Sequence, residues 1–315
     1  MGKTERWTMK ILIVSGFLGA GKTTFIQALA KYTGRDFAVL ENEYGAEGID
    51  GERLSRGMAN EEVNIWEMTE GCICCSAKGD FAASVLTIAN VVNPEYLVVE
   101  PTGVGMLGKI VENLQRIEYE HISLLSPVTV VDLHSFQRYM REYPELYRGQ
   151  IEEAGTVIVS KTEQAGKEEK EQIQAELEKL NQSGTIITEH YSTMSREAWL
   201  RLLETKYDGS KIKESREEQA ALPDSFSMSK VYVQSPELLL CFLEDLIRGK
   251  FGDVFRAKGH FLAGKRTLSF DVSDGRYCVT GTDAETDGKV VFIGKDIHRQ
   301  EIRRYFFRKI MHSPR

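Results

Sequence analysis

The residues with the clearest chemical potential form a glycine-rich segment that directly follows an apolar run: Gly16-Phe-Leu-Gly-Ala-Gly-Lys-Thr-Thr24. It matches the full GxxxxGK[ST] pattern, in which backbone N–H groups surround phosphate oxygens because glycine leaves no side chain in the way. The helix that follows adds partial positive charge at its N-terminus. We predict a triphosphate site in which Lys22 reaches the β- and γ-phosphates and Thr23 ligates Mg²⁺. The residues expected to line it are Gly16, Gly19, Ala20, Gly21, Lys22, Thr23 and Thr24.

A carboxylate ends a second apolar run, Leu97-Val-Val-Glu100, and a Pro-Thr-Gly turn follows it. An apolar strand that delivers one charge beside a phosphate loop is seldom incidental. We predict that Glu100 holds the Mg²⁺ together with Thr23, that Lys22 and Glu100 are the catalytic residues, and that Gly103 faces the γ-phosphate. The alternative for Glu100 is a strand-end carboxylate that caps the next turn.

The segment Ser160-Lys161-Thr162-Glu163 lies at a strand end where guanine-specific P-loop proteins carry Asn-Lys-x-Asp. A carboxylate there accepts hydrogen bonds from guanine N1 and N2, and adenine lacks those donors. Glutamate is one methylene longer than aspartate and still accepts both. We favour GTP over ATP, with Ser160, Lys161 and Glu163 on the base side. The alternative for Glu163 is a carboxylate in the first turn of a helix.

Three of the five cysteines lie within four positions, at Cys72, Cys74 and Cys75. Soft thiolate ligands suit Zn²⁺ or Cu(I) better than Mg²⁺ or Ca²⁺. We predict a transition-metal site, zinc in the first place, and its fourth ligand would come from Glu43, Glu47, His121 or water. The alternative is a turn with buried or redox-active thiols. The remaining two cysteines, Cys241 and Cys278, are expected to be ordinary core residues.

Upstream of these cysteines, the acidic, glycine-punctuated segment 41–50 contains Glu43. It follows a predicted strand, where P-loop switch proteins place a nucleotide-sensing loop. The alternative is a solvated surface loop.

The scaffold for these residues is predicted from short β-branched runs that alternate with helical patterns over residues 1–205. Near-continuous apolar strands between helices indicate a mostly parallel sheet covered by helices on both faces, hence an α/β fold of the P-loop NTPase type. The expected strands are Ile11–Ser15, Phe37–Glu41, Tyr96–Glu100, Val128–Asp132, Thr156–Ser160 and Thr185–Thr188. The expected helices are Thr23–Tyr32, Gly79–Val92, Leu107–Ile117, Ser135–Tyr143, Glu163–Leu180 and Arg196–Glu204.

A polar, charged stretch then predicts a linker at 206–225, followed by a smaller α+β domain at 226–315. The strands expected in that domain are Phe226–Val233, Val254–Ala263, Thr267–Val272, Tyr277–Gly281 and Val290–Gly294, with helices Pro236–Arg248 and Asp296–Met311. The final helix would face the core through Ile302, Tyr305, Phe306 and Ile310, and a homodimer through it is left open.

Charge and hydropathy exclude several classes of protein. Forty basic and 47 acidic residues give a net charge of −7, and no basic run is present, so no nucleic-acid partner is expected. No window approaches the roughly 18 apolar residues that a membrane span needs. Met1–Lys10 is polar and unlike a signal peptide, so we expect a cytoplasmic protein.

Together these motifs resemble the CobW-like family of metallochaperone GTPases, relatives of the hydrogenase and urease maturation GTPases. The matching segments are GFLGAGKTT at 16–24, NEYGAEGID at 42–50, GCICC at 71–75, EPTGVG at 100–105, VVD at 130–132 and SKTE at 160–163, with further likeness at 254–259 and 292–294. The resemblance implies GTP hydrolysis tied to metal binding, with delivery of zinc, cobalt or a metal cofactor to a client protein. It also implies that Cys72, Cys74 and Cys75 bind the metal and that Glu43 matches the glutamate of an Asn-Glu-Phe-Gly loop.

The chain departs from the family pattern at Ala46, where glutamate is usual, at Leu107, often proline, and in its SKTE segment. It also lacks a histidine-rich stretch, which argues against bulk metal storage.

Three function hypotheses are open from the sequence. The first is a metal-linked GTPase, with slow intrinsic turnover because no arginine finger or catalytic glutamine is evident. The second is an ATP-dependent P-loop kinase of small molecules, which would leave the three neighbouring cysteines without a role. The third is a nucleotide-binding adaptor with little turnover that docks a client.

Overall fold

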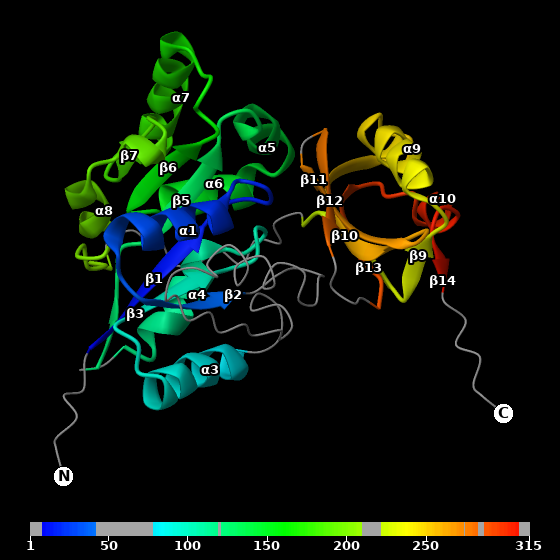
Figure 1. Cartoon of the computed structure of the whole chain (residues 1–315). Coiled ribbons are helices and arrows are strands. Elements are labelled where there is room, and N and C mark those ends of the chain that lie inside the picture. Colours follow the sequence, from blue (N-terminus) through cyan, green and yellow to red (C-terminus); the bar gives the residue numbers. More distant parts are fainter. Residues whose placement is uncertain are drawn as a thin grey trace. The chain divides into compact units, whose positions relative to one another are not determined.

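The protein is described by a computed structural model over residues 8–41, 78–118, 121–209, 222–273, 275–282 and 287–308. Its contacts divide these residues into two compact units, one ending before residue 210 and one starting at Leu222 (Figure 1). No helix in the described ranges is both long and apolar enough to cross a membrane.

The first unit is built on a parallel sheet. Its strands are β1 (Met9–Ser15), β2 (Phe37–Glu41), β3 (Tyr96–Glu100), β4 (Ile122–Leu124), β5 (Val128–Asp132), β6 (Thr156–Ser160) and β7 (Thr185–Ile187). They lie in the order β2-β3-β1-β5-β6-β7, with β4 also paired to β1, and all of these pairs are parallel. Because the strands run the same way, their carboxyl ends meet at one edge of the sheet, which is where ligands bind in open α/β sheets.

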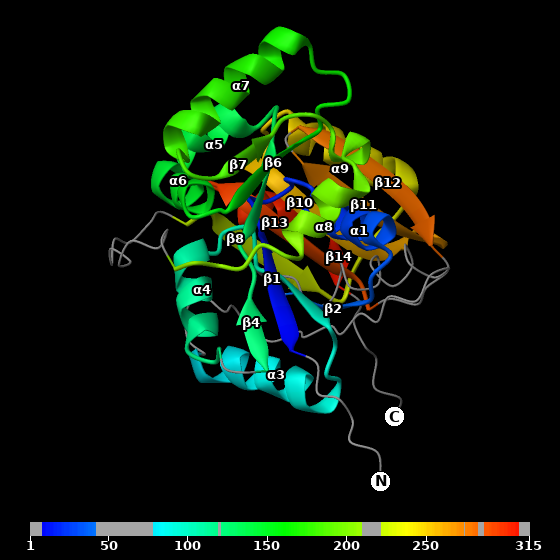
Figure 2. The same cartoon turned by 90° about the vertical axis from the view of Figure 1, so that its left-hand side faces the viewer.

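Helices cover both faces of this sheet. They are α1 (Lys22–Thr33), α3 (Lys78–Val91), α4 (Leu107–Gln115), α5 (Phe136–Glu142), α6 (Pro144–Glu152), α7 (Lys167–Leu180) and α8 (Arg196–Leu202), with a 3-10 helix η1 (Tyr191–Thr193). Alternate residues of β1 separate the two cores: Leu12 and Val14 pack with residues of α1 and α8, whereas Ile11 and Ile13 pack with residues of α3 and α4. Figures 1 and 2 show α1 and α8 on one side of the sheet and α3 and α4 on the other. The predicted fold, a mostly parallel sheet between helical layers, is confirmed.

Some elements of the first unit differ from the sequence prediction. Strand β4 and helix α6 were not predicted, and α6 begins with Pro144 in its first turn, a position that proline favours because its missing N–H has no helical partner there. Helix α7 begins at Lys167, not at Glu163, so the interpretation of Glu163 as a first-turn carboxylate is wrong.

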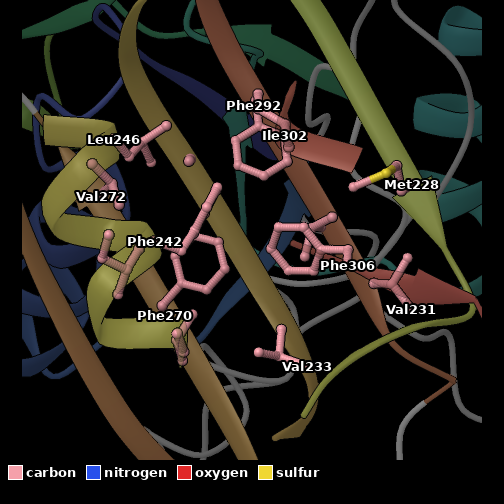
Figure 3. Packing of buried hydrophobic residues seen from close by; sticks show 14 of the residues in the cluster. Met228, Val231, Val233, Phe242, Leu246, Phe270, Val272, Phe292, Ile302 and Phe306 are labelled. Carbon is pink, nitrogen blue, oxygen red and sulfur yellow. The ribbon is translucent and has the colours of Figure 1, made fainter. Parts of the chain in front are cut away.

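The second unit is a mainly antiparallel sheet, in which only the described pair of β9 and β10 is parallel, packed against one long helix. It contains β8 (Asp224–Ser229), β9 (Val231–Val233), α9 (Pro236–Ile247), β10 (Asp253–Ala263), β11 (Arg266–Ser273), β12 (Arg276–Thr282), β13 (Lys289–Lys295), α10 (Arg299–Arg303) and β14 (Phe307–Arg308). The order is β12-β11-β10-β13-β8, and β9 pairs with β10 and β14. Phe242 and Leu246 of α9 pack onto Phe270, Phe292 and Phe306 in its core (Figure 3). The predicted α+β composition is confirmed.

Two predictions for the second unit are wrong. The final helix is the short α10, and the chain then becomes extended as β14, which pairs with the otherwise open edge of β9. Ile302 and Phe306 nevertheless pack in the core as predicted.

Cys241 and Cys278 are exposed rather than buried. On α9, Leu239, Phe242, Leu243 and Leu246 face the core, which turns residue 241 outward. On β12, Tyr277 and Val279 pack against the core, so the residue between them points to the other face.

The predicted domain limits, 1–205 and 226–315, stay predictions. Most of the predicted linker, residues 210–221, lies outside the described residues. At its ends, Lys206 bridges to Leu125 of the first unit and Asp224 already begins β8.

Candidate functional site

The glycine-rich loop joins β1 to α1 at the carboxyl edge of the first unit's sheet. Gly16 has a φ of +140°, and a Cβ placed on it would lie 2.3 Å from the carbonyl oxygen of Val130. Gly21 caps α1 in the left-handed region, with a φ of +93°. Both positions therefore require glycine, and they bring the N-terminus of α1 to the mouth of the loop.

Lys22 is buried within this loop. Its Nζ donates to the carbonyl oxygens of Gly16, at 3.1 Å, and Phe17, at 3.4 Å. Ser160, at the end of β6, supports the loop from outside, because its Oγ lies 2.7 Å from the carbonyl oxygen of Ala20. The ammonium group thus sits on the loop that is predicted to surround the phosphates.

Thr23 and Glu100 lie together, as the prediction of a shared Mg²⁺ site requires. The Thr23 Oγ1 is 3.1 Å from each of the two Glu100 carboxylate oxygens. A hydroxyl and a carboxylate are hard oxygen donors, and Mg²⁺ typically uses one or two such groups together with phosphate oxygens and water. The donor set therefore fits Mg²⁺. Thr24, the next residue of α1, is exposed.

The turn after Glu100 lies directly against the phosphate loop. A Cβ on Gly103 would lie 2.6 Å from the backbone nitrogen of Leu18, so only glycine allows this approach. Gln150 of α6 holds the turn, because its Nε2 donates to the carbonyl oxygens of Gly103, at 3.1 Å, and Gly105, at 2.9 Å. The Gln150 side chain is buried.

Helix α6 also contacts the phosphate loop itself. The Phe17 ring packs on Tyr139 of α5 and Tyr147 of α6, with centroid separations of 4.2 and 5.6 Å. Sequence reasoning missed Gln150 and this aromatic contact. The signal that could have found α6 is Pro144, which marks a helix start after the predicted helix at 135–143.

Glu153, at the end of α6, contacts the start of α4, the helix that follows the turn after Glu100. Glu153, the C-cap residue of α6, accepts a hydrogen bond from the backbone N–H of Gly108, in the first turn of α4. Burial, partly offset by this bond and reinforced by the neighbouring charge of Glu152, raises the pKa of Glu153 to about 7. This carboxyl group therefore titrates near neutral pH.

The predicted base side lies at the ends of β5, β6 and β7. Lys161 has a φ of +60°, and its Nζ lies 2.5 Å from Oδ2 of the buried Asp132. The Asp132 carboxylate also accepts from the backbone N–H of His134, at 2.9 Å. The Glu163 side chain is 59% exposed, and its Oε1 lies 3.1 Å from Nε2 of His190. Sequence reasoning missed this histidine, since it is far from Glu163 in the chain.

Most of the predicted transition-metal ligands are not among the residues that the structure describes. Cys72, Cys74, Cys75, Glu43 and Glu47 all lie outside the described residues. Within the described part of the chain, which includes His121, no group of three or more His, Cys, Asp or Glu side chains could hold a metal ion. The zinc site therefore remains a prediction.

Comparisons with known proteins identify the family of the chain. A family model described as the CobW/HypB/UreG nucleotide-binding domain matches residues 10–188, and one described as the cobalamin synthesis protein cobW C-terminal domain matches residues 224–308. The "Zinc chaperone CobW" of Pseudomonas aeruginosa is 30% identical in an alignment 198 residues long, and the alignment covers 54% of this chain and 53% of that protein. The "Zinc chaperone YeiR" of Escherichia coli is 30% identical over 165 residues, 51% of this chain and 49% of that protein.

The chain thus matches about half the length of these curated relatives. The crystal structure of the Zn(II)-bound YjiA GTPase from E. coli covers 94% of this chain, and the match spans 97% of that chain, with 20% identity and a TM-score of 0.47. Since the nucleotide-binding family model alone covers more than half of the residues, the chain belongs to the CobW/HypB/UreG family of nucleotide-binding proteins.

Proposed function

We propose that this protein is a GTPase that couples slow GTP hydrolysis to the binding of zinc and its delivery to a client protein. The observation that carries the nucleotide half of the proposal is the pairing of Thr23 Oγ1 with both Glu100 oxygens at 3.1 Å, at the mouth of a glycine-rich loop that carries Lys22. Hydroxyl, carboxylate and ammonium groups converge there as an Mg²⁺-triphosphate requires.

On the phosphate side, Lys22 would exchange its bonds to the loop carbonyls for bonds to the β- and γ-phosphates. Thr23 and Glu100 would hold Mg²⁺, which when bound neutralises charge on the phosphate oxygens. Gly103 would present its backbone beside the γ-phosphate, because the turn that contains it lies on the loop at Leu18. Gln150 would keep that turn in place.

On the base side, the chain would select guanine through Glu163, with Ser160 and Lys161 completing the pocket wall. Glu163 is exposed at the end of β6 and so is accessible to a base. A carboxylate accepts from guanine N1 and N2 together, and adenine offers no such pair of donors.

The zinc half rests on the thiols Cys72, Cys74 and Cys75 with Glu43, and on relatives that are named zinc chaperones. One structural fact supports the coupling of the two halves. Glu41, the last residue of β2, is paired with Glu100 in the parallel ladder with β3. The segment that leads to Glu43 and the thiols thus starts beside the proposed Mg²⁺ ligand, so a nucleotide-dependent change at Glu100 has a short path to it.

The test is hydrolysis by the full chain with Mg²⁺ and either GTP or ATP, with and without Zn²⁺. We expect GTP to be the better substrate, phosphate to be released to water, and Zn²⁺ to change the turnover rate. The double variant Cys74→Ser/Cys75→Ser should bind zinc more weakly and lose the response to Zn²⁺ while it keeps the basal rate.

Two results would reject the proposal. A zinc effect of unchanged size in the double variant would show that the thiols are not involved. A preference for ATP, with transfer to an acceptor other than water, would indicate a kinase instead.

A further inference from the structure

Glu163, the residue proposed to read the base, contacts a side chain from the loop that follows a neighbouring strand. Strands β6 and β7 are parallel neighbours, with Ile158 paired to Ile187. The chain leaves both at the same edge of the sheet, and Glu163 and His190 each lie three residues beyond the end of their strand. Their contact, 3.1 Å between His190 Nε2 and Glu163 Oε1, joins the two loops.

The partners of His190 favour the tautomer with its hydrogen on Nε2. Nδ1 lies 2.6 Å from Ser192 Oγ and accepts from the backbone N–H of Ser192 at 3.3 Å, the capping bond of η1, whereas Nε2 faces a carboxylate oxygen, which can only accept. A neutral imidazole whose Nδ1 is an acceptor carries its hydrogen on Nε2. The Nε2–H therefore donates to the Glu163 carboxylate.

The imidazole is also fixed by packing. Its ring lies over Tyr191, with centroids 4.4 Å apart and planes inclined by 31°. Tyr191 is buried and packs edge-on against Phe25 of α1, with centroids 5.7 Å apart, and against Trp199 of α8. His190 thus packs against the core that includes residues of α1, the helix that begins in the phosphate loop.

We propose that His190 is a positioning residue for guanine recognition, which holds the Glu163 carboxylate in the orientation that reads N1–H and N2–H. This inference rests on the proposed function, since it assumes that the nucleotide is GTP. Each carboxylate oxygen has two lone pairs. Oε1 can therefore accept from His190 and from the base at once, and Oε2 remains for the second base donor.

A glutamate needs this support more than an aspartate would. Its extra methylene adds one rotatable bond, and an exposed side chain must lose that freedom to bind a base. A hydrogen bond already formed in the free protein removes part of that entropy loss in advance. Because the charge stays on the carboxylate when the imidazole is neutral, Glu163 keeps its full strength as an acceptor.

The experiment compares three His190 variants of the full chain by calorimetric titration with GDP, IDP and ADP in Mg²⁺. Inosine lacks the N2 amino group, so the GDP-to-IDP affinity ratio reports the second base bond. His190→Ala removes ring and donor, His190→Phe keeps an aromatic ring on Tyr191 without a donor, and His190→Gln keeps an N–H donor without the ring.

We expect His190→Ala and His190→Phe to lower the affinity for GDP by about 3- to 10-fold, which is the contribution of one hydrogen bond. ADP affinity should be unchanged, and the GDP-to-IDP ratio should fall toward one. His190→Gln should restore GDP affinity and the ratio to within about 3-fold of the wild-type protein. Thermal melting of the three variants separates loss of fold from loss of recognition.

The outcomes for this inference and for the proposed function are distinct. If wild-type protein prefers GDP and His190→Phe retains both the GDP affinity and the GDP-to-IDP ratio, the inference is wrong and guanine binding stands. If the His190 variants lose affinity for GDP and ADP equally, the inference is also wrong, since the histidine would then only support the fold. If the wild-type protein itself binds ADP as well as GDP, the proposed guanine preference fails first.

Discussion

The phosphate side and the base side of the candidate site are stabilised in different ways. On the phosphate side, buried groups bond to backbone atoms: Lys22 donates to loop carbonyls, and Gln150 donates to Gly103 and Gly105. On the base side, side chains pair with one another: the partly exposed Lys161 with the buried Asp132, and the exposed Glu163 with His190. We infer that the backbone of the phosphate side is preformed, so that binding mainly redirects the Lys22 ammonium group, whereas the base side can be adjusted by single side chains.

The largest effect is expected from the centre of the phosphate side. Lys22→Ala should lower GTP hydrolysis by about 100- to 1,000-fold, comparable to the loss of one preorganised donor to developing charge in other enzymes. Single-turnover hydrolysis measures this. Lys31→Ala, an exposed lysine in the last turn of the same helix, is the matched control and should hydrolyse GTP like the wild-type protein. If both variants hydrolyse GTP alike, the phosphate site is not where we propose it.

The next effect is a pH dependence of stability through Glu153. Its pKa is about 7 in the folded protein, against an ordinary value of 4.5, so between these values the folded state keeps a proton that the unfolded state has lost. The contribution of this proton to the free energy of unfolding is fully present below about pH 4.5 and is lost as the pH rises through 7. Over that range it amounts to up to about 3 kcal/mol.

The measurement is urea unfolding at pH 5, 6, 7 and 8, with Glu153→Gln as reference because its side chain does not titrate. The free energy of unfolding of the wild-type protein should fall relative to the variant as the pH rises. Curves that stay parallel would show that the carboxyl group is not buried against Gly108 as described.

A smaller effect is expected for the helix that supports the turn after Glu100. Gln150→Leu keeps the volume of the side chain but leaves the carbonyl oxygens of Gly103 and Gly105 without their donor, which costs about 1–3 kcal/mol of stability. Hydrolysis should also slow, because the turn beside the γ-phosphate loosens. Denaturant unfolding and turnover measure the two effects, and Gln172→Leu on the exposed face of α7 is the control. A variant as stable and as active as that control would break the assignment of α6 as the support of the site.

Some features of the fold and of the site follow directly from the sequence. Strands β2, β3, β5 and β6 begin and end where apolar, β-branched runs predict, and the phosphate loop lies between β1 and α1 as its contiguous motif requires. These features depend on neighbours in the chain. Glu100, predicted from the charge that ends an apolar strand, lies beside Thr23 because the parallel neighbours β1 and β3 end at the same edge of the sheet.

The features that were not predicted depend on contacts between distant residues. Gln150 and Gly103 are 47 positions apart in the sequence, and no local pattern links them. The same holds for His190 and Glu163, which meet only because β7 pairs with β6. The prediction of a long final helix was wrong for a related reason: the apolar spacing is helical, but the chain after α10 pairs with β9 as strand β14.

The smallest effect is expected on the base side, at the pair of Lys161 and Asp132. Asp132→Asn keeps the shape of the side chain and can still accept from the His134 N–H, but it removes the charge that attracts Lys161. Lys161 is partly exposed, so water can solvate its ammonium group in the variant, and the loss of stability should be about 1 kcal/mol or less. GDP affinity should fall by no more than about 3-fold, because the ladder of β5 and β6 keeps the backbone at Lys161 in place. Titration calorimetry measures this, and a fall in GDP affinity of about 100-fold or more would mean that the base side is as rigidly built as the phosphate side.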